Sequence, residues 1–332
     1  EALRAAAEKD PELRRLLAEE DLPDVLRVEN HLKQQAKYAG APLAKCKVGQ
    51  GINAWSKKAN MTIGPFVRAC QERLLRALKP NITMVLHQSE RELADWIAAV
   101  HTGAPCVCND FTEFDSTQNN GTVHFECLVL AQFGCPPSIV STYRRLRAAA
   151  RVSARSCTVD AANARMSGEA STLFGNTIVT MAVNALLFPG ACDWAAFKGD
   201  DSIICNPAQR CDVPTIECQT GMKCKVEEPV VPEFVGLLIS DGAVYPDLKR
   251  RVGKLSGKGY PGDPMARDQF KQSIADTLSL MPPAEVEHAL FCNAAAHGCT
   301  TADAQVWYDI LRACAADLPK PQRVEAIEAR VE

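Results

Sequence analysis

The fold of this chain is decided by the segment Trp194-Ala-Ala-Phe-Lys-Gly-Asp-Asp-Ser-Ile-Ile204. Two short apolar runs flank a Gly-Asp-Asp turn, and this pattern is typical of a β-hairpin. The adjacent carboxylates Asp200 and Asp201 are therefore expected at a turn. Because Asp and Gly are common turn residues for purely conformational reasons, the hairpin alone does not assign a function.

A second acidic segment precedes the hairpin in the chain. Residues 104–108 form a short apolar run that predicts a strand, and Asn109-Asp-Phe-Thr-Glu-Phe-Asp115 follows it directly. If this strand neighbours the hairpin in one sheet, Asp110 converges with Asp200 and Asp201. Carboxylates are hard oxygen ligands for Mg²⁺ or Mn²⁺, and three of them can hold two metal ions for an in-line phosphoryl transfer.

The rest of the chain predicts a mixture of helices and strands. Helical spacing is found in residues 61–80 and 88–100, and Ser89 with Glu92 matches a capping box at the start of the second helix. Further helices are predicted in a lead-in at 1–30, at 122–133, after Pro136-Pro137, and over most of 264–317. Another helix is predicted to follow the loop 166–172 and to run through Asn184. Further strands are predicted at 222–226 and 234–239.

Composition excludes several classes of protein. The 332 residues carry a formal net charge of -3, which is ordinary for a soluble globular protein. The longest apolar stretch, residues 178–188, is far shorter than the roughly 18 residues of a membrane-spanning helix. The first residues show no targeting signal, and we expect the chain to be a piece of a longer one.

The cysteines and histidines show no metal-binding spacing. Fifteen cysteines, an odd number, are scattered among apolar runs, which favours reduced thiols in a cytosolic compartment. The closest cysteine pairs lack the two-residue gap of a zinc knuckle, and the six histidines are dispersed. The sequence therefore predicts small core residues and no His-based metal site.

The net charge hides three basic segments. Residues 31–80 contain ten Lys or Arg against the single acid Glu72, and further basic clusters lie at 144–165 and 249–258. Such runs are commonly solvated faces, but three of them could line one groove for a phosphate-rich partner. From the last cluster, Arg250, Arg251 and Lys254 are candidates for binding such a partner.

The ordered motifs resemble those of viral RNA-dependent RNA polymerases of the alphavirus-like plus-strand supergroup, most closely those of hepatitis E virus and its hepevirus-like relatives. The resemblance covers roughly residues 25 to 260. Four blocks carry it: Lys47-Val-Gly-Gln-Gly-Ile-Asn-Ala-Trp-Ser-Lys57, Asp110-Phe-Thr-Glu-Phe-Asp-Ser-Thr-Gln-Asn-Asn120, Ser167-Gly-Glu-Ala-Ser-Thr-Leu-Phe-Gly-Asn-Thr177 and Phe197-Lys-Gly-Asp-Asp-Ser-Ile-Ile204.

This resemblance implies a fold and a domain organisation. The expected fold is an α+β right-hand polymerase with fingers, palm and thumb, in which the palm is an antiparallel sheet flanked by helices. The implied domains are an N-terminal lead-in with partial fingers at 1–104, a palm at 105–246 with an inserted fingers segment near 136–165, and a helical thumb at 247–332.

The resemblance also implies a role for individual residues. Asp110, Asp200 and Asp201 would be the metal-binding and catalytic acids, and Lys223, with Lys225 as the alternative, would protonate the departing pyrophosphate. Asp115 and Asn176 would contact the ribose 2′-hydroxyl, the group that distinguishes RNA from DNA precursors. The implied nucleotide-binding residues are Lys45, Lys47, Asp115, Ser167, Gly168, Thr172 and Asn176, and Lys33 and Lys37 would line an RNA channel.

The implied activity is template-directed RNA synthesis from ribonucleoside triphosphates with Mg²⁺, or Mn²⁺ in its place, as cofactor. Expected partners are RNA and other replicase domains of the same polyprotein, such as a capping enzyme and a helicase, without a membrane span in this chain. The expected location is the host cytoplasm, in a replication complex that other regions attach to membranes. The alternatives are a catalytically silent RNA-binding fragment, a reverse transcriptase, against which Asp115 and Asn176 argue, and a basic nucleic-acid-binding module.

Overall fold

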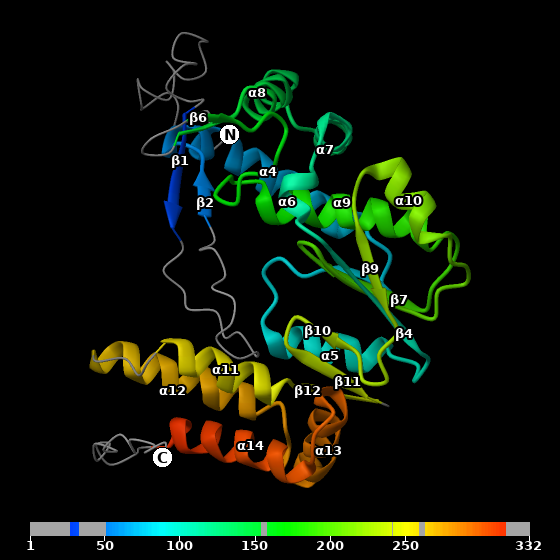
Figure 1. Ribbon diagram of the computed structural model, residues 1–332, viewed down its shortest axis with the longest axis vertical. Helices are drawn as coiled ribbons and strands as arrows, with labels where there is room; N and C mark the ends of the chain where they lie inside the picture. The colour runs from blue at the N-terminus through cyan, green and yellow to red at the C-terminus, as the bar shows by residue number, and fades with distance from the viewer. Residues whose placement is uncertain (1–26, 33–50, 154–157, 241, 259–262, 317–332) are drawn as a thin grey trace, which may run out of the picture.

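The computed structural model describes residues 27–32, 51–153, 158–240, 242–258 and 263–316 (Figure 1). Helices and strands both contribute, which confirms the α+β prediction at this level. A five-stranded sheet lies at the centre. Its strands in spatial order are β3 (Ile82–Met84), β7 (Trp194–Lys198), β8 (Asp201–Cys205), β4 (Cys106–Phe111) and β9 (Cys224–Glu227).

The central sheet is antiparallel apart from one edge. β7 and β8 form the predicted hairpin, and β8 pairs with β4, which in turn pairs with β9, all in antiparallel fashion. β3 pairs parallel with β7 at the edge. Sequence patterning did not predict β3, because three residues are too few to show an alternating pattern.

Alternating side chains of the sheet pack into two separate cores. Trp194, Ala196 and Ile203 face one core, whereas Phe197 and Ile204 face the other. A strand that is buried on both faces reads as a nearly continuous apolar run, which explains the composition of the hairpin segment.

Helices and a small sheet cover the two faces of the central sheet. α9 (Thr172–Leu187) and α10 (Val213–Thr220) contribute side chains to the core that contains Phe197 and Ile204. The other core contains α5 (Glu90–Val100) and a small antiparallel sheet. The strands of that sheet are β10 (Glu233–Phe234), β11 (Leu237–Ser240) and β12 (Ala243–Pro246).

Two further groups of elements flank this centre. One group combines helices with a four-stranded sheet of order β2-β1-β5-β6. Its members are β1 (Arg27–Leu32), β2 (Gly51–Ala54), β5 (Arg151–Ser153), β6 (Thr158–Asp160), α4 (Lys57–Ala77), α7 (Asn120–Gln132) and α8 (Pro137–Ala148). The other is the C-terminal helical group, at the bottom of Figure 1: α11 (Leu248–Lys258), α12 (Pro264–Leu278), the 3₁₀ turn η1 (Pro283–Glu285), α13 (Val286–His297) and α14 (Thr301–Ala315).

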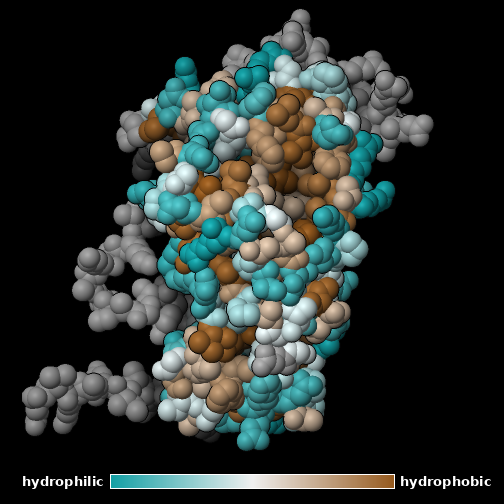
Figure 2. Space-filling model, turned by 90° about the vertical axis from the view of Figure 1, so that its right-hand side faces the viewer, coloured by the Kyte–Doolittle hydropathy of each residue, from teal (hydrophilic) through white to brown (hydrophobic). Residues whose placement is uncertain are grey.

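Most predicted elements are confirmed within a few residues, including the capping box of Ser89 and Glu92 on α5. The helical lead-in was wrong at its end, because Arg27–Leu32 form β1, which pairs with β2 and β5. The rest of that lead-in, residues 1–26, lies outside the described residues. Figure 2 shows that hydrophobic side chains gather in patches among hydrophilic ones on one face of the molecule. Among the described helices, none combines the length and the hydropathy that a membrane crossing requires.

Candidate active site

Three carboxylates meet at one end of the central sheet. β4 and β8 are antiparallel neighbours whose register pairs Asn109 with Ser202, so the next positions, Asp110 and Asp201, come level with each other. Asp200 precedes Asp201 in the turn of the hairpin. The predicted convergence of the two acidic segments on one sheet is therefore confirmed.

A tight turn holds Asp200 in place. Lys198 pairs with Asp201 across the hairpin, so Gly199 and Asp200 form a two-residue turn. Gly199 has φ +61°, a left-handed conformation that favours glycine. Its N–H donates to the buried Thr177 hydroxyl of α9 at 2.9 Å. The helix behind the sheet thus fixes the turn that carries the acid.

A buried polar group supports Asp110 and Asp201 from below. Asn109 donates to Asn184 at 3.3 Å, Asn184 donates to Ser202 at 3.1 Å, and the Ser202 hydroxyl donates to the backbone carbonyl of Asn109 at 3.1 Å. These three residues are the direct neighbours of the acids or lie on the helix beneath them. Sequence reasoning missed Thr177, Asn184 and Ser202 as supports, since only the fold brings them together.

The acids repel one another electrostatically. Burial, followed by the charges of Asp110 and Asp115, raises the pKa of Asp200. Burial, followed by the charges of Asp200, Glu233 and Asp110, raises the pKa of Asp201 to about 6. Both residues are exposed, and each lines a concave pocket. Such a group of uncompensated oxygen donors fits a divalent cation, because a bound cation would cancel the repulsion.

Two pockets open on the acids. The larger, about 650 Å³, is lined by Asp200 together with Asp115, Asn176 and Ser167. The smaller, about 320 Å³, is lined by Asp110, Asp201 and Lys225 among others. The acids thus lie between a pocket that contains the predicted sugar-contacting residues and a second pocket beside β9.

Asp115 and Asn176 form a hydrogen-bonded pair. The Asn176 amide of α9 donates to Asp115 Oδ1 at 2.8 Å. Arg165 Nε donates to the amide oxygen of Asn176 at 2.9 Å. Because the amide oxygen is occupied by a guanidinium, the amide nitrogen has to face Asp115. The predicted juxtaposition of Asp115 and Asn176 is therefore present, and Arg165 orients it.

Arg165 belongs to a fully buried ionic cluster. Its guanidinium donates to Glu126 of α7 at 2.6 Å and also pairs with Glu169. Arg147 of α8 pairs with Glu169 at 3.0 Å, and Tyr143 donates to Glu126. Although burial acts to raise it, the two arginines hold the pKa of Glu126 below its usual value. Two cations and two anions thus compensate one another in the interior. The sequence analysis assigned no role to Glu169, because the cluster also includes Arg147 of α8 and Glu126 of α7, which only the fold brings to this loop.

Two glycines allow the close contacts of this region. A Cβ atom on Gly175 would lie 2.5 to 2.8 Å from the Arg165 guanidinium, so only glycine leaves room for it on α9. A Cβ atom on Gly168 would lie 2.7 Å from the Cβ of Ala54 in β2. The Gly168 N–H donates to the carbonyl of Asn53 at 2.8 Å, and the Asn53 N–H donates to the Ser167 hydroxyl at 3.1 Å. The loop before α9 is therefore attached to β2.

Comparison with known proteins identifies the family. A family model described as RNA dependent RNA polymerase matches residues 6–318. The chain belongs to the RNA-dependent RNA polymerase family. The chain is also similar to the non-structural polyprotein pORF1 of hepatitis E virus genotype 3, isolate Swine/United States/swUS1, with 34% identity over 77% of this chain. The same polyprotein of genotype 1, isolate Human/Pakistan/Sar-55, is 32% identical over 77% of this chain.

These relatives confirm the predicted resemblance to hepevirus-like polymerases. The chain spans about 15% of the length of each polyprotein. The prediction of an RNA-directed RNA polymerase is thus confirmed for this segment, and the relatives carry it within a longer polyprotein.

The lysines predicted for this polymerase have different positions. Lys225 in β9 pairs in register with Asp110, lines the smaller pocket, and bonds to Glu227 at 2.8 Å. That hydrogen bond raises the pKa of Lys225. Lys223 precedes β9 and lines neither of the two pockets. The geometry places the alternative, Lys225, closer to the acids than Lys223.

The other predicted contact residues of the polymerase are distributed as follows. The Thr172 hydroxyl donates to the carbonyls of Met166 and Glu169, so it caps the loop before α9 and does not line the larger pocket. Arg250 pairs with Glu233, and Arg251 pairs with Glu90 of α5. Lys254 lies in α11. The predicted Lys33, Lys37, Lys45 and Lys47 lie outside the described residues.

Proposed function

We propose that this chain catalyses template-directed RNA synthesis, adding ribonucleoside monophosphates to the 3′ end of RNA by a two-metal mechanism. The observation that carries the proposal is the convergence of Asp110, Asp200 and Asp201 beside a pocket that holds the Asp115–Asn176 pair. One wall of this site can bind metal ions, and the other can contact a sugar. Nucleotidyl transfer requires both properties in one place.

The three acids are proposed to hold Mg²⁺, with Mn²⁺ as the possible substitute. A bound divalent ion supplies charge stabilisation to the transferring phosphoryl group and lowers the pKa of the attacking 3′-hydroxyl. The chain's own contribution is to fix the carboxylates on β4 and on the hairpin turn before substrate arrives, with Asn109, Ser202 and Thr177 behind them. A preorganised site requires little rearrangement during the reaction.

The Asp115–Asn176 pair is proposed to select the ribose. Asp115 would accept a hydrogen bond from the 2′-hydroxyl of the incoming nucleotide, and the Asn176 amide would support that contact. A deoxynucleotide would leave the partly buried Asp115 without this partner, and an unpaired polar group costs free energy. This proposal favours an RNA polymerase over a reverse transcriptase.

Proton transfer to the departing pyrophosphate is proposed to come from a lysine at the start of β9. Lys225 lines the smaller pocket together with Asp110 and Asp201. Lys223 precedes β9 and does not line this pocket. A raised pKa keeps Lys225 protonated, as a general acid has to be. Lys223→Ala and Lys225→Ala variants distinguish the two candidates.

The proposed layout assigns the central sheet to a palm. We propose that the palm consists of residues 105–246 together with β3 and α5, which join its sheet and its core although they precede residue 105. The rest of 1–104 and an insert near 136–165 are proposed to belong to fingers, and the helices of 247–332 to a thumb. The pocket with Asp115 and Asn176 then lies where palm and fingers meet.

Partners and location follow from the same proposal. RNA and ribonucleoside triphosphates are the substrates, and the other replicase domains of a polyprotein, such as capping enzyme and helicase, are proposed partners. We propose a cytoplasmic replication complex of the host cell as the location. A catalytically silent RNA-binding fragment is the alternative.

The proposal is tested by extension of a primed RNA template with the purified chain, ribonucleotides and Mg²⁺ or Mn²⁺. The expected result is extension that is lost in the Asp200→Ala plus Asp201→Ala double variant. Equal extension by both proteins would reject the metal site, and RNA binding without extension by either would favour the silent fragment. A filter-binding assay on both proteins separates these outcomes from a loss of folding.

A further inference from the structure

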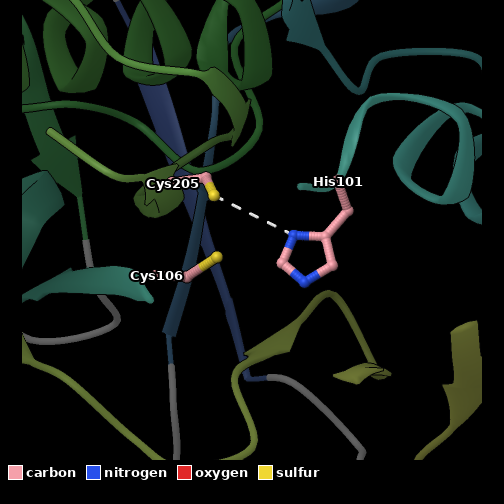
Figure 3. Close-up of side chains that lie close together, drawn as sticks. All are labelled: His101, Cys106 and Cys205. Atoms are coloured by element: carbon pink, nitrogen blue, oxygen red, sulfur yellow. Dashed lines mark hydrogen bonds between the residues drawn. The ribbon is translucent and has the colours of Figure 1, made fainter. Parts of the chain in front are cut away.

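A cluster of one histidine and two cysteines lies at the end of the sheet away from the acids. Cys106 begins β4 and Cys205 ends β8, whereas Asp110 and Asp201 lie at the opposite ends of the same strands. Each cysteine is four positions along its strand from the acid, a distance of about 13 Å. His101 caps the C-terminal end of α5 and faces the same place (Figure 3). Nothing in the proposed nucleotidyl transfer uses these three side chains.

Their geometry fits a tetrahedral metal ion. Cys106 and Cys205 are directly opposite each other in the antiparallel register. His101 Nδ1 lies 3.9 Å from Cys205 Sγ, and the three potential ligand atoms lie within 4.8 Å of one another. Ligands of a tetrahedral zinc ion, with bonds of about 2.0 to 2.3 Å, are roughly 3.5 to 4 Å apart. The cluster therefore needs a contraction of at most about 1 Å.

The supporting contacts orient the ligands. The backbone N–H of His101 donates to the carbonyl of Ile97 at 2.8 Å, and the imidazole packs edge-on against Trp194 with ring centroids 5.8 Å apart. Figure 3 shows the imidazole with Nδ1 turned toward Cys205 Sγ. The two cysteines are buried and fixed by the sheet, so the ligand set is preorganised on rigid elements.

Solvent can reach the fourth coordination position. Thr102 is exposed and His101 is half-buried, so an ion and a water molecule can reach the cluster. The Thr102 hydroxyl lies 3.9 Å from Cys205 Sγ and donates to Asp193 at 2.7 Å. A water molecule can therefore complete the coordination.

We propose that His101, Cys106 and Cys205 bind a zinc ion that ties the end of α5 to β4 and β8. Thiolate and imidazole ligands select zinc over the Mg²⁺ that carboxylates bind. Without a metal, the contacts of the two thiols are long: both lie near the Ala104 carbonyl, at 3.8 and 3.5 Å, and Cys205 Sγ also lies 3.9 Å from His101 Nδ1 and from the Thr102 hydroxyl. Binding replaces the two thiol protons by one divalent ion, so the protons are released to solvent and the buried site stays close to neutral.

The sequence predicted no His-based metal site, and the reason is topological. Local spacing reveals zinc sites whose ligands come in close pairs, such as a zinc knuckle. Here the ligands come from a helix end and two strands that are far apart in the sequence, so only the register of β4 and β8 brings them together.

The proposal is tested by zinc titration of the full chain after treatment with a chelator, with a chromophoric competitor as readout. Wild type is expected to bind one zinc ion that Mg²⁺ does not displace and that raises Tm. Cys205→Ser and His101→Gln are expected to weaken binding on the order of 100-fold, because even residues that merely support metal ligands contribute about 10- to 100-fold. His101→Gln changes a half-buried residue, so it still tests the proposal if Cys205→Ser, which changes a buried residue, fails to fold.

Cys108→Ser is the matched control, since Cys108 lies on the same strand two residues from Cys106 and outside the cluster. It is expected to bind zinc as wild type does. Equal zinc affinity in wild type and His101→Gln would overturn the proposal. Mass-spectrometric detection of a Cys106–Cys205 disulfide in the freshly purified protein would also overturn it. Neither readout depends on polymerase activity.

Discussion

The proposed selection of ribonucleotides depends on two side chains, Asp115 and Asn176. Asn176 donates to Asp115 at 2.8 Å, and Arg165 prevents the amide from turning round. Asp115→Ala removes the acceptor for the 2′-hydroxyl. We expect its preference for ribonucleotides over deoxyribonucleotides to fall by about 10- to 100-fold, the discrimination that one or two hydrogen bonds provide.

This prediction is checked by single-nucleotide incorporation of UTP and dUTP in parallel. Ser116→Ala is the matched control, because Ser116 is the adjacent exposed residue and lines the same pocket. A variant that loses activity toward both nucleotides equally would show that Asp115 has a structural role and does not select the sugar.

The mutual repulsion of the acids predicts a pH-dependent stability. The pKa of Asp201 is raised to about 6, above its value of about 3.9 in an unfolded chain. The folded state therefore binds the proton more tightly, and the free energy of unfolding of the metal-free protein should decrease as pH rises from about 4 to about 6. Asp201→Asn should make this decrease smaller, and the part that remains belongs to Asp200, whose pKa is also raised.

At pH 7 the variant should be more stable than wild type by on the order of 1 kcal/mol. The full shift would correspond to about 3 kcal/mol, but the solvent-exposed part of the side chain reduces the effect. Urea denaturation from pH 4 to pH 8 with a chelator measures it, with the exposed Asp95→Asn of α5 as control. A stability difference that does not change with pH would contradict the electrostatic explanation.

At the scale of elements, the buried ionic cluster joins α7, α8 and the start of α9. Arg165 pairs with Glu126 and Glu169, and Arg147 pairs with both of these acids. Arg165→Met leaves two buried carboxylates with one cation. We expect the free energy of unfolding to fall by about 3 to 5 kcal/mol, because an uncompensated buried charge is strongly unfavourable.

Urea denaturation at pH 7 checks this value. Arg144→Met is the matched control, since it removes the same charge from the exposed face of α8 and should change stability by less than about 0.5 kcal/mol. Similar effects of both variants would mean that the cluster contributes no more than the surface arginine does.

The elements themselves could largely be predicted from sequence, because their signals are local. The hairpin with Asp200 follows from two apolar runs around a turn, and α5 follows from its capping box. The short strands β1, β2, β3, β5, β6 and β12 and the two-turn helix α10 were not predicted, since such short elements are defined by their partners. The sequence motifs placed Asp110 and Asp115 in the site. They did not place Arg165 there, because Arg165 lies outside the motifs and its role depends on a hydrogen bond to Asn176 that only the fold reveals.

At the scale of the whole molecule, the basic residues do not all serve one surface. Arg250 and Arg251 are engaged by Glu233 and Glu90, and the second of these ion pairs joins α11 to α5. Charges that already have a partner release fewer counterions when RNA binds. We therefore expect these two arginines to contribute less to RNA binding than their position in a basic cluster suggested.

This difference can be measured from the salt dependence of binding to single-stranded RNA. The Lys33→Ala plus Lys37→Ala variant should lower the slope of log affinity against log salt by about 1.4, the value for two phosphate contacts. Arg250→Ala should lower the slope by less than the about 0.7 of one full contact. An equal loss per residue in both variants would assign Arg250 to the RNA surface.

The central claim is that two distant acidic segments form one catalytic metal site. Asp110 tests it most directly, because it lies on β4, outside the Gly-Asp-Asp turn, and joins the site only through the register of the sheet. The measurement is the Mg²⁺-dependent rate of single-nucleotide addition by wild type and Asp110→Asn, with Asp95→Asn as the control. The account predicts a loss of about 100-fold or more for Asp110→Asn with RNA binding retained. Addition at the wild-type rate by Asp110→Asn would contradict it.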